Sequence, residues 1–280
     1  MRSPVVCLAI FATACTAAQQ QSFNKTVQQV VANHAAAITL VATPAVPLPD
    51  GGAGPSFPVA NVFFGKRSPT DTTSPPVALP GAAVSIEDSA GVVASATDVG
   101  NGDYLATPDG GLRYDPGATY TFTIDYDGGS YVAGGTAPFP EHVSQLEPQF
   151  ADGGGVAVPV FPTVAVGGGM TLDRDPNPDG GPLNIAFVTV NLITGSGASA
   201  QPTYTSVPQT PLALLELVAP GGDATYRAAQ VTLPGSAFPQ AGDYLVTLTA
   251  VQEGAPQSSN LFALSAILLG AGTAGIVQAK

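Results

Sequence analysis

The chain has little of what catalytic and nucleic-acid-binding proteins commonly use. Its 280 residues include no tryptophan, two histidines and two cysteines, and only 10% of them are charged. Eight lysines and arginines stand against 20 acidic residues, which gives a formal charge of −12. Binding to phosphates requires clustered cations, so this composition argues against a nucleic-acid partner. Two histidines leave little capacity for acid–base chemistry near neutral pH. We recognise no catalytic constellation and expect a protein that is not an enzyme.

The residues that are abundant favour short strands joined by turns. Glycine (33 residues) and proline (27 residues) are frequent, and 45% of the chain is hydrophobic. Glycine and proline disfavour helix interiors and suit turns, while the apolar content is sufficient to build a core. A chain of this length can form one large or two ordinary domains. These properties predict an all-β fold.

The N-terminus has the pattern of an export signal. Arg2 precedes an apolar run from Val5 to Ala14, and Cys15 follows it. This run is too short to span a bilayer of about 30 Å. We therefore expect residues 1–14 to be a signal peptide. Its removal takes Cys7 away and leaves one thiol, so no internal disulfide can form.

Residues 12–15 (ATAC) resemble the lipobox of exported bacterial lipoproteins, in which a small residue precedes an acylated cysteine. Ala12 stands where that family usually has leucine. The resemblance implies that Cys15 carries a lipid and that a membrane is the partner. Because Thr16 rather than an aspartate follows the cysteine, it also implies the outer membrane. The alternative is ordinary cleavage after Ala14, which would give a periplasmic or secreted protein.

Residues 15–37 are expected to form the lipid anchor and a polar tether. Within this stretch, five residues recur at helical spacing and predict one short amphipathic helix: Phe23, Val27, Val30, Val31 and His34. On this interpretation His34 lies on a helix face and is not a ligand.

Beyond the tether we expect two β modules, residues 38–140 and 141–280. The first module has strand patterns at Ile38–Val41, Val59–Phe64, Ala83–Ile86, Val92–Ser95, Tyr120–Tyr126 and Ser130–Ala133. The second has them at Val156–Val160, Asn184–Ile193, Leu212–Val218, Thr225–Leu233, Tyr244–Gln252 and Leu261–Leu269. Asp127-Gly128-Gly129 predicts a tight hairpin turn, because these residues tolerate positive φ.

A short repeat supports two modules. The sequence Gly-Asp-Tyr-Leu occurs at residues 102–105 and again at residues 242–245. In β-sandwiches, a glycine of this kind makes a bend and the tyrosine hydroxyl then bonds to nearby backbone, which is called a tyrosine corner. The repeat predicts one such corner in each module.

Residues 82–138 resemble the Ig-like or transthyretin-like (carboxypeptidase-regulatory-like) modules of secreted bacterial proteins. The matching segments are Gly81–Val84, Asp88–Gly91, Gly102–Tyr104, Pro116–Phe122 and Tyr131–Ala133. Residues 141–280 are similar, more loosely, to cadherin-like and fibronectin-like sandwiches. The resemblance implies two consecutive β-sandwich modules that serve as spacers, adhesive units or presenting domains, without catalytic residues. It leaves the protein or glycan partner open.

The one motif with metal-binding character lies in the second module. Asp173, Asp175, Asn177 and Asp179 alternate along the chain, and their oxygen atoms are the ligands that Ca²⁺ prefers. The motif departs from an EF-hand at Pro178, and it is similar to a loop that precedes a strand in cadherin-like modules. The alternative is an ordinary Pro/Gly/Asp turn without a metal.

Residues 261–279 carry no charge and approach the length of a membrane-spanning helix. We favour two strands, Leu261–Leu269 and Ile276–Ala279, with a turn at residues 271–275. The most plausible function is that of a non-enzymatic cell-envelope lipoprotein with a structural or binding role. One alternative is a secreted module that binds carbohydrate or peptide along a strand edge or an exposed aromatic patch. A second alternative is a glycoside hydrolase-type enzyme with two carboxylates at the module interface.

Overall fold

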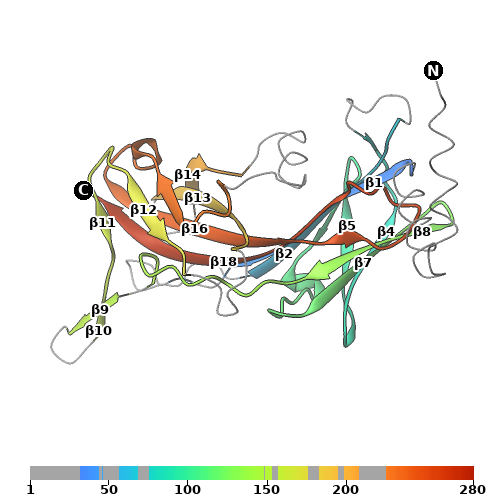
Figure 1. Ribbon diagram of the computed structural model, residues 1–280, viewed down its shortest axis with the longest axis horizontal. Coiled ribbons are helices and arrows are strands. Elements are labelled where there is room, and N and C mark those ends of the chain that lie inside the picture. The colour runs from blue at the N-terminus through green and yellow to red at the C-terminus, as the bar shows by residue number, and fades with distance from the viewer. Residues whose placement is uncertain are drawn as a thin grey trace, which may run out of the picture.

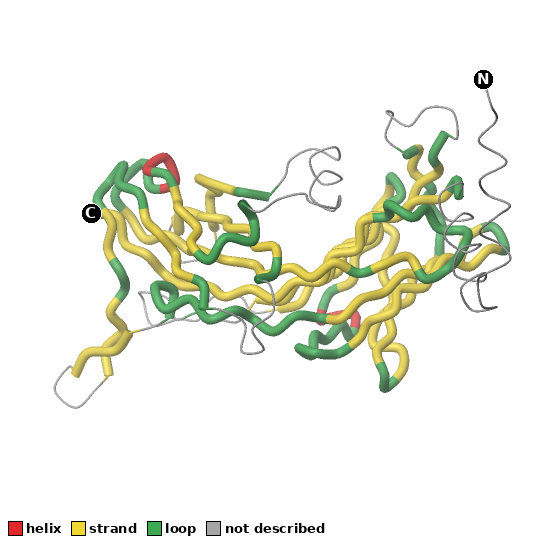
Figure 2. The backbone as a smooth tube through the Cα atoms, viewed as in Figure 1, coloured by secondary structure: helices red, strands yellow, loops and turns green. Residues whose placement is uncertain are grey.

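The computed structural model describes residues 32–43, 46, 57–68, 76–147, 149–152, 157–175, 183–194, 199–207 and 225–280. Strands dominate this part of the chain, and its helical residues are confined to two short 3₁₀ turns, η1 (Pro108–Gly110) and η2 (Gly235–Ala237), as Figure 2 shows. The predicted all-β, sandwich-like fold is confirmed. Within the described ranges, no helix has the length and apolar character needed to cross a membrane.

Strands of the first half of the chain are β1 (His34–Thr43), β2 (Phe57–Lys66), β3 (Val77–Ala78), β4 (Ala83–Asp88), β5 (Gly91–Gly100), β6 (Asp103–Ala106), β7 (Thr119–Tyr126) and β8 (Gly129–Thr136). Those of the second half are β9 (Gln149–Asp152), β10 (Ala157–Val160), β11 (Thr163–Val164), β12 (Met170–Asp173), β13 (Ile185–Thr194), β14 (Ser199–Thr205), β15 (Gln230–Leu233), β16 (Gly242–Glu253), β17 (Ala255–Pro256) and β18 (Ala266–Ala279).

One sheet of 14 strands unites the two halves, in the order β14-β13-β16-β18-β1-β2-β6-β5-β4-β7-β8-β17, with β11 and β3 attached to β18 and β2. Strand β1 lies between β18, to which it is parallel, and β2, to which it is antiparallel. In Figure 1 the molecule is elongated, with β4, β5, β7 and β8 at one end and β12 to β14 at the other. The long strands β2, β16 and β18 run between these ends.

The core is divided into two main clusters. The first contains aromatic and aliphatic side chains of β1 to β8, such as Phe64 and Phe122, which are fully buried. The second is built around β13, β16 and η2. Three residues from the end of the chain, Leu261, Ile267 and Leu269, belong to the first cluster. The first core therefore draws on both sides of the predicted boundary at residue 140.

The prediction of two strands, Leu261–Leu269 and Ile276–Ala279, with a turn between them is wrong in two respects: the strand begins only at Ala266, and no turn interrupts it. Residues 266–279 form one uninterrupted strand of 14 residues, β18, which pairs with β16 over 12 positions. Gly275, the last residue of the predicted turn, admits close approach of another backbone segment instead. A Cβ atom on Gly275 would lie 2.3 Å from the carbonyl oxygen of Leu146. Only glycine at this position therefore lets the segment that contains Leu146 pack against β18.

The expectation that His34 lies on a helix of the tether is also wrong. His34 is the first residue of β1 and is paired with Lys66 of β2. Its imidazole stacks on the ring of Phe64, with 5.6 Å between the ring centroids. Strands β2 and β18 supply hydrogen-bond partners for the backbone of β1. This pairing with distant strands outweighs the helical spacing of the apolar residues. The other four residues of the predicted helix, Phe23, Val27, Val30 and Val31, lie outside the described residues.

Both predicted tyrosine corners are confirmed. The hydroxyl of Tyr244 donates to the carbonyl oxygen of Gln240 at 2.8 Å, and that of Tyr104 donates to the carbonyl oxygen of Leu79 at 2.7 Å. Tyr120 makes a third arrangement of this kind, since its hydroxyl donates to the carbonyl oxygen of Arg113 at 3.1 Å, although its glycine, Gly117, stands three positions earlier and not two as in the Gly-Asp-Tyr-Leu repeat. All three tyrosines are buried and fix loops against the core.

The remaining strand predictions agree with the structure to different degrees. The hairpin of β7 and β8 is confirmed, and both Asp127 and Gly128 have positive φ in its turn. Strand β13 matches the pattern predicted at Asn184–Ile193. Of the strand expected at Thr225–Leu233, only Gln230–Leu233 is extended. The strand expected at Leu212–Val218 lies outside the described residues.

Candidate functional site at the junction of residues 141–147 and 173–175

A cluster of charged side chains lies where two segments of the described chain meet. Residues 141–147 follow β8 and cross over β18, where the hydroxyl of Thr273 donates to the carbonyl oxygen of Glu141. Residues 173–175 end β12 and lie against this crossing segment. The backbone N–H of Asp175 donates to the carbonyl oxygen of His142 at 3.3 Å. We call the two segments together the junction.

Arg174 is the buried centre of the junction. Its guanidinium forms a two-point ion pair with Glu141, with N···O distances of 2.5 and 2.7 Å. The two side chains are 0% and 4% exposed. Further N–H groups of Arg174 donate to three backbone carbonyl oxygens, those of Asn184, Tyr226 and Ala228. All five N–H donors of the guanidinium are thereby used. Arg174 thus ties the crossing segment to two loops of the second half.

His142 lies between two carboxylates at the surface of the junction. Its Nδ1 is 2.6 Å from Asp175 Oδ2, and its Nε2 is 2.7 Å from Glu147 Oε1. The hydrogen bonds to Asp175 and Glu147 raise the pKa of His142 above its ordinary value. A neutral imidazole has one N–H, so only the imidazolium can donate to both carboxylates. With both nitrogens engaged, this histidine is not placed to serve as a general base.

Asp173 is held by glutamine side chains. Gln145 Nε2 donates to one carboxylate oxygen at 2.6 Å, and Gln230 Nε2 donates to the other at 2.8 Å. Gln145 also accepts a hydrogen bond from the backbone N–H of Asp173 at 3.1 Å. These bonds connect the crossing segment, β12 and β15 into one hydrogen-bonded unit.

The four residues of the predicted calcium motif are therefore described only in part. Asp173 and Asp175 belong to the junction, and their carboxylates already bond to different partners, the glutamines and His142. Asn177 and Asp179 lie outside the described residues, as does the predicted lipidation site, Cys15. Among the described residues, no three His, Cys, Asp or Glu side chains are grouped to hold a metal ion. Calcium binding stays a prediction.

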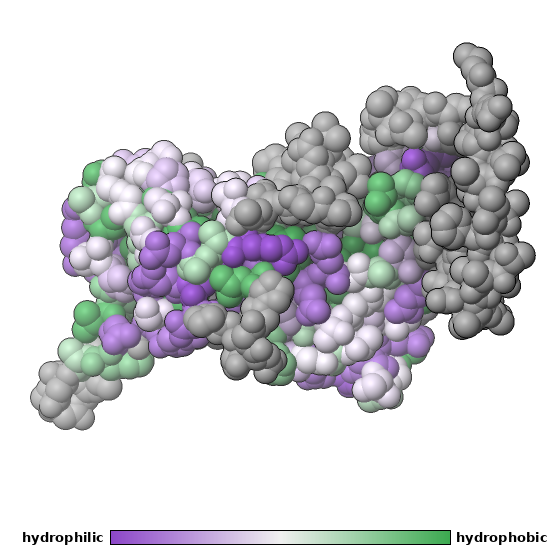
Figure 3. Space-filling view, in the orientation of Figure 1, coloured by the Kyte–Doolittle hydropathy of each residue, from purple (hydrophilic) through white to green (hydrophobic). Residues whose placement is uncertain are grey.

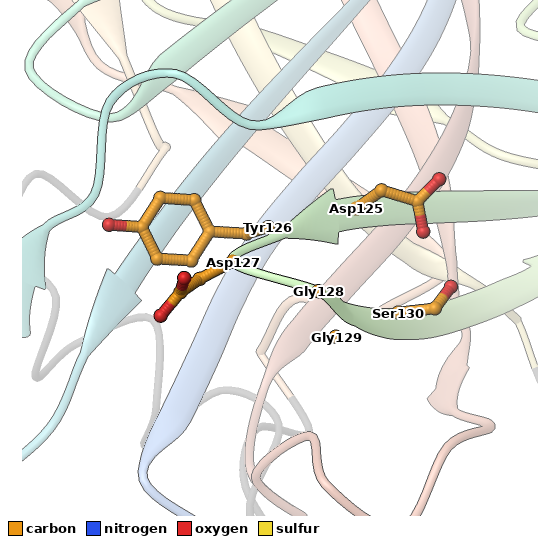
Figure 4. A pocket seen from close by; sticks show the side chains of 6 residues that line it. All are labelled: Asp125, Tyr126, Asp127, Gly128, Gly129 and Ser130. Atoms are coloured by element: carbon orange, nitrogen blue, oxygen red, sulfur yellow. The ribbon is translucent and has the colours of Figure 1, made fainter.

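A shallow, open pocket lies at the other end of the molecule, at the tip of the β7–β8 hairpin. It has a volume of about 330 Å³ and is lined by Asp125 to Ser130. Figure 4 shows the carboxylates of Asp125 and Asp127 pointing away from each other, with the ring of Tyr126 beside Asp127. A glycosidase needs two carboxylates on either side of one bond, and these two do not converge in that way.

The aromatic residues of the described chain mostly pack on one another inside the fold. Phe64 contacts both Tyr131 and Tyr126, and Phe64 and Tyr131 are buried. Phe139 and Phe150 are 68% and 60% exposed, respectively. In Figure 3, polar and apolar residues are interspersed on the visible face.

Sequence reasoning did not assign the residues that hold the junction together. Arg174 lies within the predicted calcium motif, but the motif suggested a role only for its acidic neighbours. Glu141 and His142 open the second predicted module, and no sequence pattern assigned them a role. One signal was available: an arginine between two aspartates, in a chain with only eight cations, is a candidate for a buried ion pair. Its partner, 33 positions earlier, could not be identified from spacing.

Comparisons with known proteins give little further information. No protein-family model and no curated protein matches the chain. Among solved structures, it is similar to the three N-terminal domains of the Highly Immunogenic Outer Capsid protein (Hoc) of bacteriophage RB49. That match has 11% sequence identity and a TM-score of 0.26, and it covers 89% of this chain and 70% of the other. At this TM-score the similarity carries no argument about function.

Proposed function

We propose that the protein is a non-enzymatic lipoprotein of the cell envelope, exported by residues 1–14 and anchored to the outer membrane through Cys15. Its β-sandwich body has a structural or binding role. The observation that carries the structural role is the continuous 14-strand sheet, which joins both halves of the molecule into one body. A spacer or scaffold needs such continuity, whereas an enzyme needs polar groups directed at a substrate.

The chemistry of the junction supports this role. Its charged groups are directed at one another: Arg174 at Glu141, and His142 at Asp175 and Glu147. Groups whose hydrogen-bonding capacity is used within the fold stabilise a conformation and have little left for a substrate. The junction is therefore best explained as a structural connection between the two halves.

Metabolic labelling with radioactive palmitate, followed by fractionation, tests the anchor. Wild-type protein should incorporate label and sediment with outer membranes, and Cys15→Ala should do neither. Cys7→Ala is the matched control, because it removes the other cysteine but leaves the acylation site intact, and it should be labelled normally. An unlabelled wild-type protein in the soluble fraction would refute the anchor and favour the periplasmic or secreted alternative.

Calcium binding by the segment from Asp173 to Asp179 is part of the same proposal. Asp175 has an exposed carboxylate, which is accessible to a cation that could displace His142. Addition of Ca²⁺ should raise the melting temperature of the wild-type protein, and Asp175→Ala should remove that increase. Mg²⁺ at the same concentration is the control for ionic strength. An identical melting temperature with and without Ca²⁺ would exclude a structural calcium site.

A further inference from the structure

The sheet of the first half would have two open edges if it consisted of β1 to β8 alone. In the order β1-β2-β6-β5-β4-β7-β8, strand β1 is one edge and β8 is the other. Residues 254–269 cover the edge at β8 and most of the edge at β1, whose last pairs are with Gly270 and Ala271. We call residues 254–269 the closing segment. An open strand edge exposes unpaired backbone N–H and C=O groups. The sheet of the first half is therefore complete only when other strands pair with both of its edges.

Residues 255–258 cover the edge formed by β8. Ala255 and Pro256 pair with Gly134 and Ala133. The carbonyl oxygen of Val132 then accepts two hydrogen bonds, from the backbone N–H groups of Gln257 (2.7 Å) and Ser258 (3.0 Å). Ser258 Oγ in turn accepts a hydrogen bond from the backbone N–H of Val132 at 3.0 Å.

Residues 262–269 cover the edge formed by β1. Ile38 pairs with Ile267, and Leu40 pairs with Leu269. Before these pairs, the backbone N–H of Phe262 donates to the carbonyl oxygen of His34 at 2.8 Å. The backbone N–H of Gly254 donates to the carbonyl oxygen of Ile267 at 2.8 Å, which links the two parts of the closing segment to each other.

Gly134 and Gly135 of β8 have close neighbours in this segment. A Cβ atom on Gly135 would lie 2.6 Å from Leu269 Cδ1 and 2.9 Å from the Cα atom of Gly254. A Cβ atom on Gly134 would lie 2.5 Å from Gln257 Nε2. The φ angles of Gly134 and Gly135 are not positive, so the backbone conformation does not require glycine at either position. A Cβ atom on Gly134 would also lie 2.6 Å from the carbonyl oxygen of Tyr120 in β7, so Gly135 is the position whose missing side chain makes room specifically for the closing segment.

The closing segment also supplies part of the first core. Leu261, Ile267 and Leu269 are at most 2% exposed and pack with side chains of β1 to β8. Without them, the first half would lose three large buried side chains and the partners of both edge strands. Burial of such side chains is a main source of folding free energy.

We propose that the closing segment makes folding of the first half conditional on the last residues of the chain. Residues 34–136 then remain without a stable fold until residues 254–269 are present. The benefit of such delayed folding rests on the proposed function, because an exported chain must stay unfolded while it crosses a membrane. The dependence of folding on the closing segment is itself a property of the polypeptide and does not require export or lipidation.

Pulsed hydrogen exchange during refolding of the full chain, read by mass spectrometry, tests this inference. Amides of β7 and β8 in the first half should become protected at the same rate as amides of β16 and β18 in the second. Protection of β7 and β8 in an earlier kinetic phase, while β18 is still open, would overturn the proposal.

A pair of full-length variants separates the closing segment from general destabilisation. Gly135→Val introduces a side chain against Leu269 and Gly254, and should slow protection of β7 about tenfold because overpacking opposes docking. Ser95→Val, on an exposed position of β5, is the control and should refold at the wild-type rate. Equal protection rates of β7 in the two variants would contradict the proposal. Both results are independent of whether Cys15 is lipidated.

Discussion

Replacement of Arg174 by methionine is the sharpest test of the junction. Methionine keeps the apolar stem but leaves the carboxylate of Glu141 buried without a countercharge. Breaking a buried ion pair from one side costs about 3–5 kcal/mol. The three carbonyl oxygens that Arg174 also bonds lose their donors, which adds to this cost. We expect a loss of about 5 kcal/mol in the free energy of unfolding, or roughly 10 °C in melting temperature.

Urea unfolding followed by far-ultraviolet circular dichroism and tyrosine fluorescence measures this loss, since the chain has no tryptophan. Arg113→Met is the matched control. Arg113 also pairs with a carboxylate, Asp88, at 2.7 Å, but its side chain is 50% exposed. An ion pair with a half-exposed arginine is screened by solvent and contributes much less to stability than a buried one. If Arg174→Met and Arg113→Met destabilise the protein equally, the structural role of the buried pair is refuted.

Three further predictions concern the turns and the histidine. Gly102→Ala should cost roughly 3 kcal/mol in urea unfolding, because φ is +74° and the new Cβ would lie 2.6 Å from a carbonyl oxygen. Gly81→Ala, with φ of +83° and open space around it, should cost only about 1 kcal/mol; equal costs would contradict the close packing. Tyr244→Phe removes the hydroxyl of a tyrosine corner and should cost about 1 kcal/mol, and a melting temperature equal to wild type would show that the corner is dispensable. The raised pKa of His142 means that protonation favours the folded state. Its stabilisation is full below the unfolded value of about 6.5 and is lost as pH rises through the folded pKa. Asp175→Asn should lower that pKa in a nuclear magnetic resonance titration, and an unchanged value would refute the contact.

The local features of this fold were predictable because they depend on short segments. Alternating residues identified β7 and β13, the Asp-Gly-Gly turn identified a hairpin, and the Gly-Asp-Tyr-Leu repeat identified two tyrosine corners. The hairpin turn and the corner at Tyr244 involve residues within a few positions of one another, whereas Tyr104 bonds to Leu79, 25 positions earlier. The same reasoning missed the corner at Tyr120, because Gly117 stands three positions before that residue and not two.

The long-range features were not predictable in this way. Pairing of β1 with β18 joins residues about 230 positions apart, and no local pattern specifies it. Residues 271–275 were predicted as a turn because sequence does not distinguish a glycine that bends the chain from one that admits a neighbour, as Gly275 does. The junction was missed for a similar reason: Arg174 and Glu141 are recognisable as partners only once the crossing segment is in place.

The parallel arrangement of β1 and β18 also determines where the polypeptide enters and leaves the body. Both strands start at the same end of the molecule, and Lys280 lies at the opposite end (Figure 1). At about 3.3 Å per residue, the 14 residues of β18 alone separate these two ends by about 43 Å. A cargo fused after Lys280 would therefore be displayed at the end of the body opposite to His34, where β1 begins.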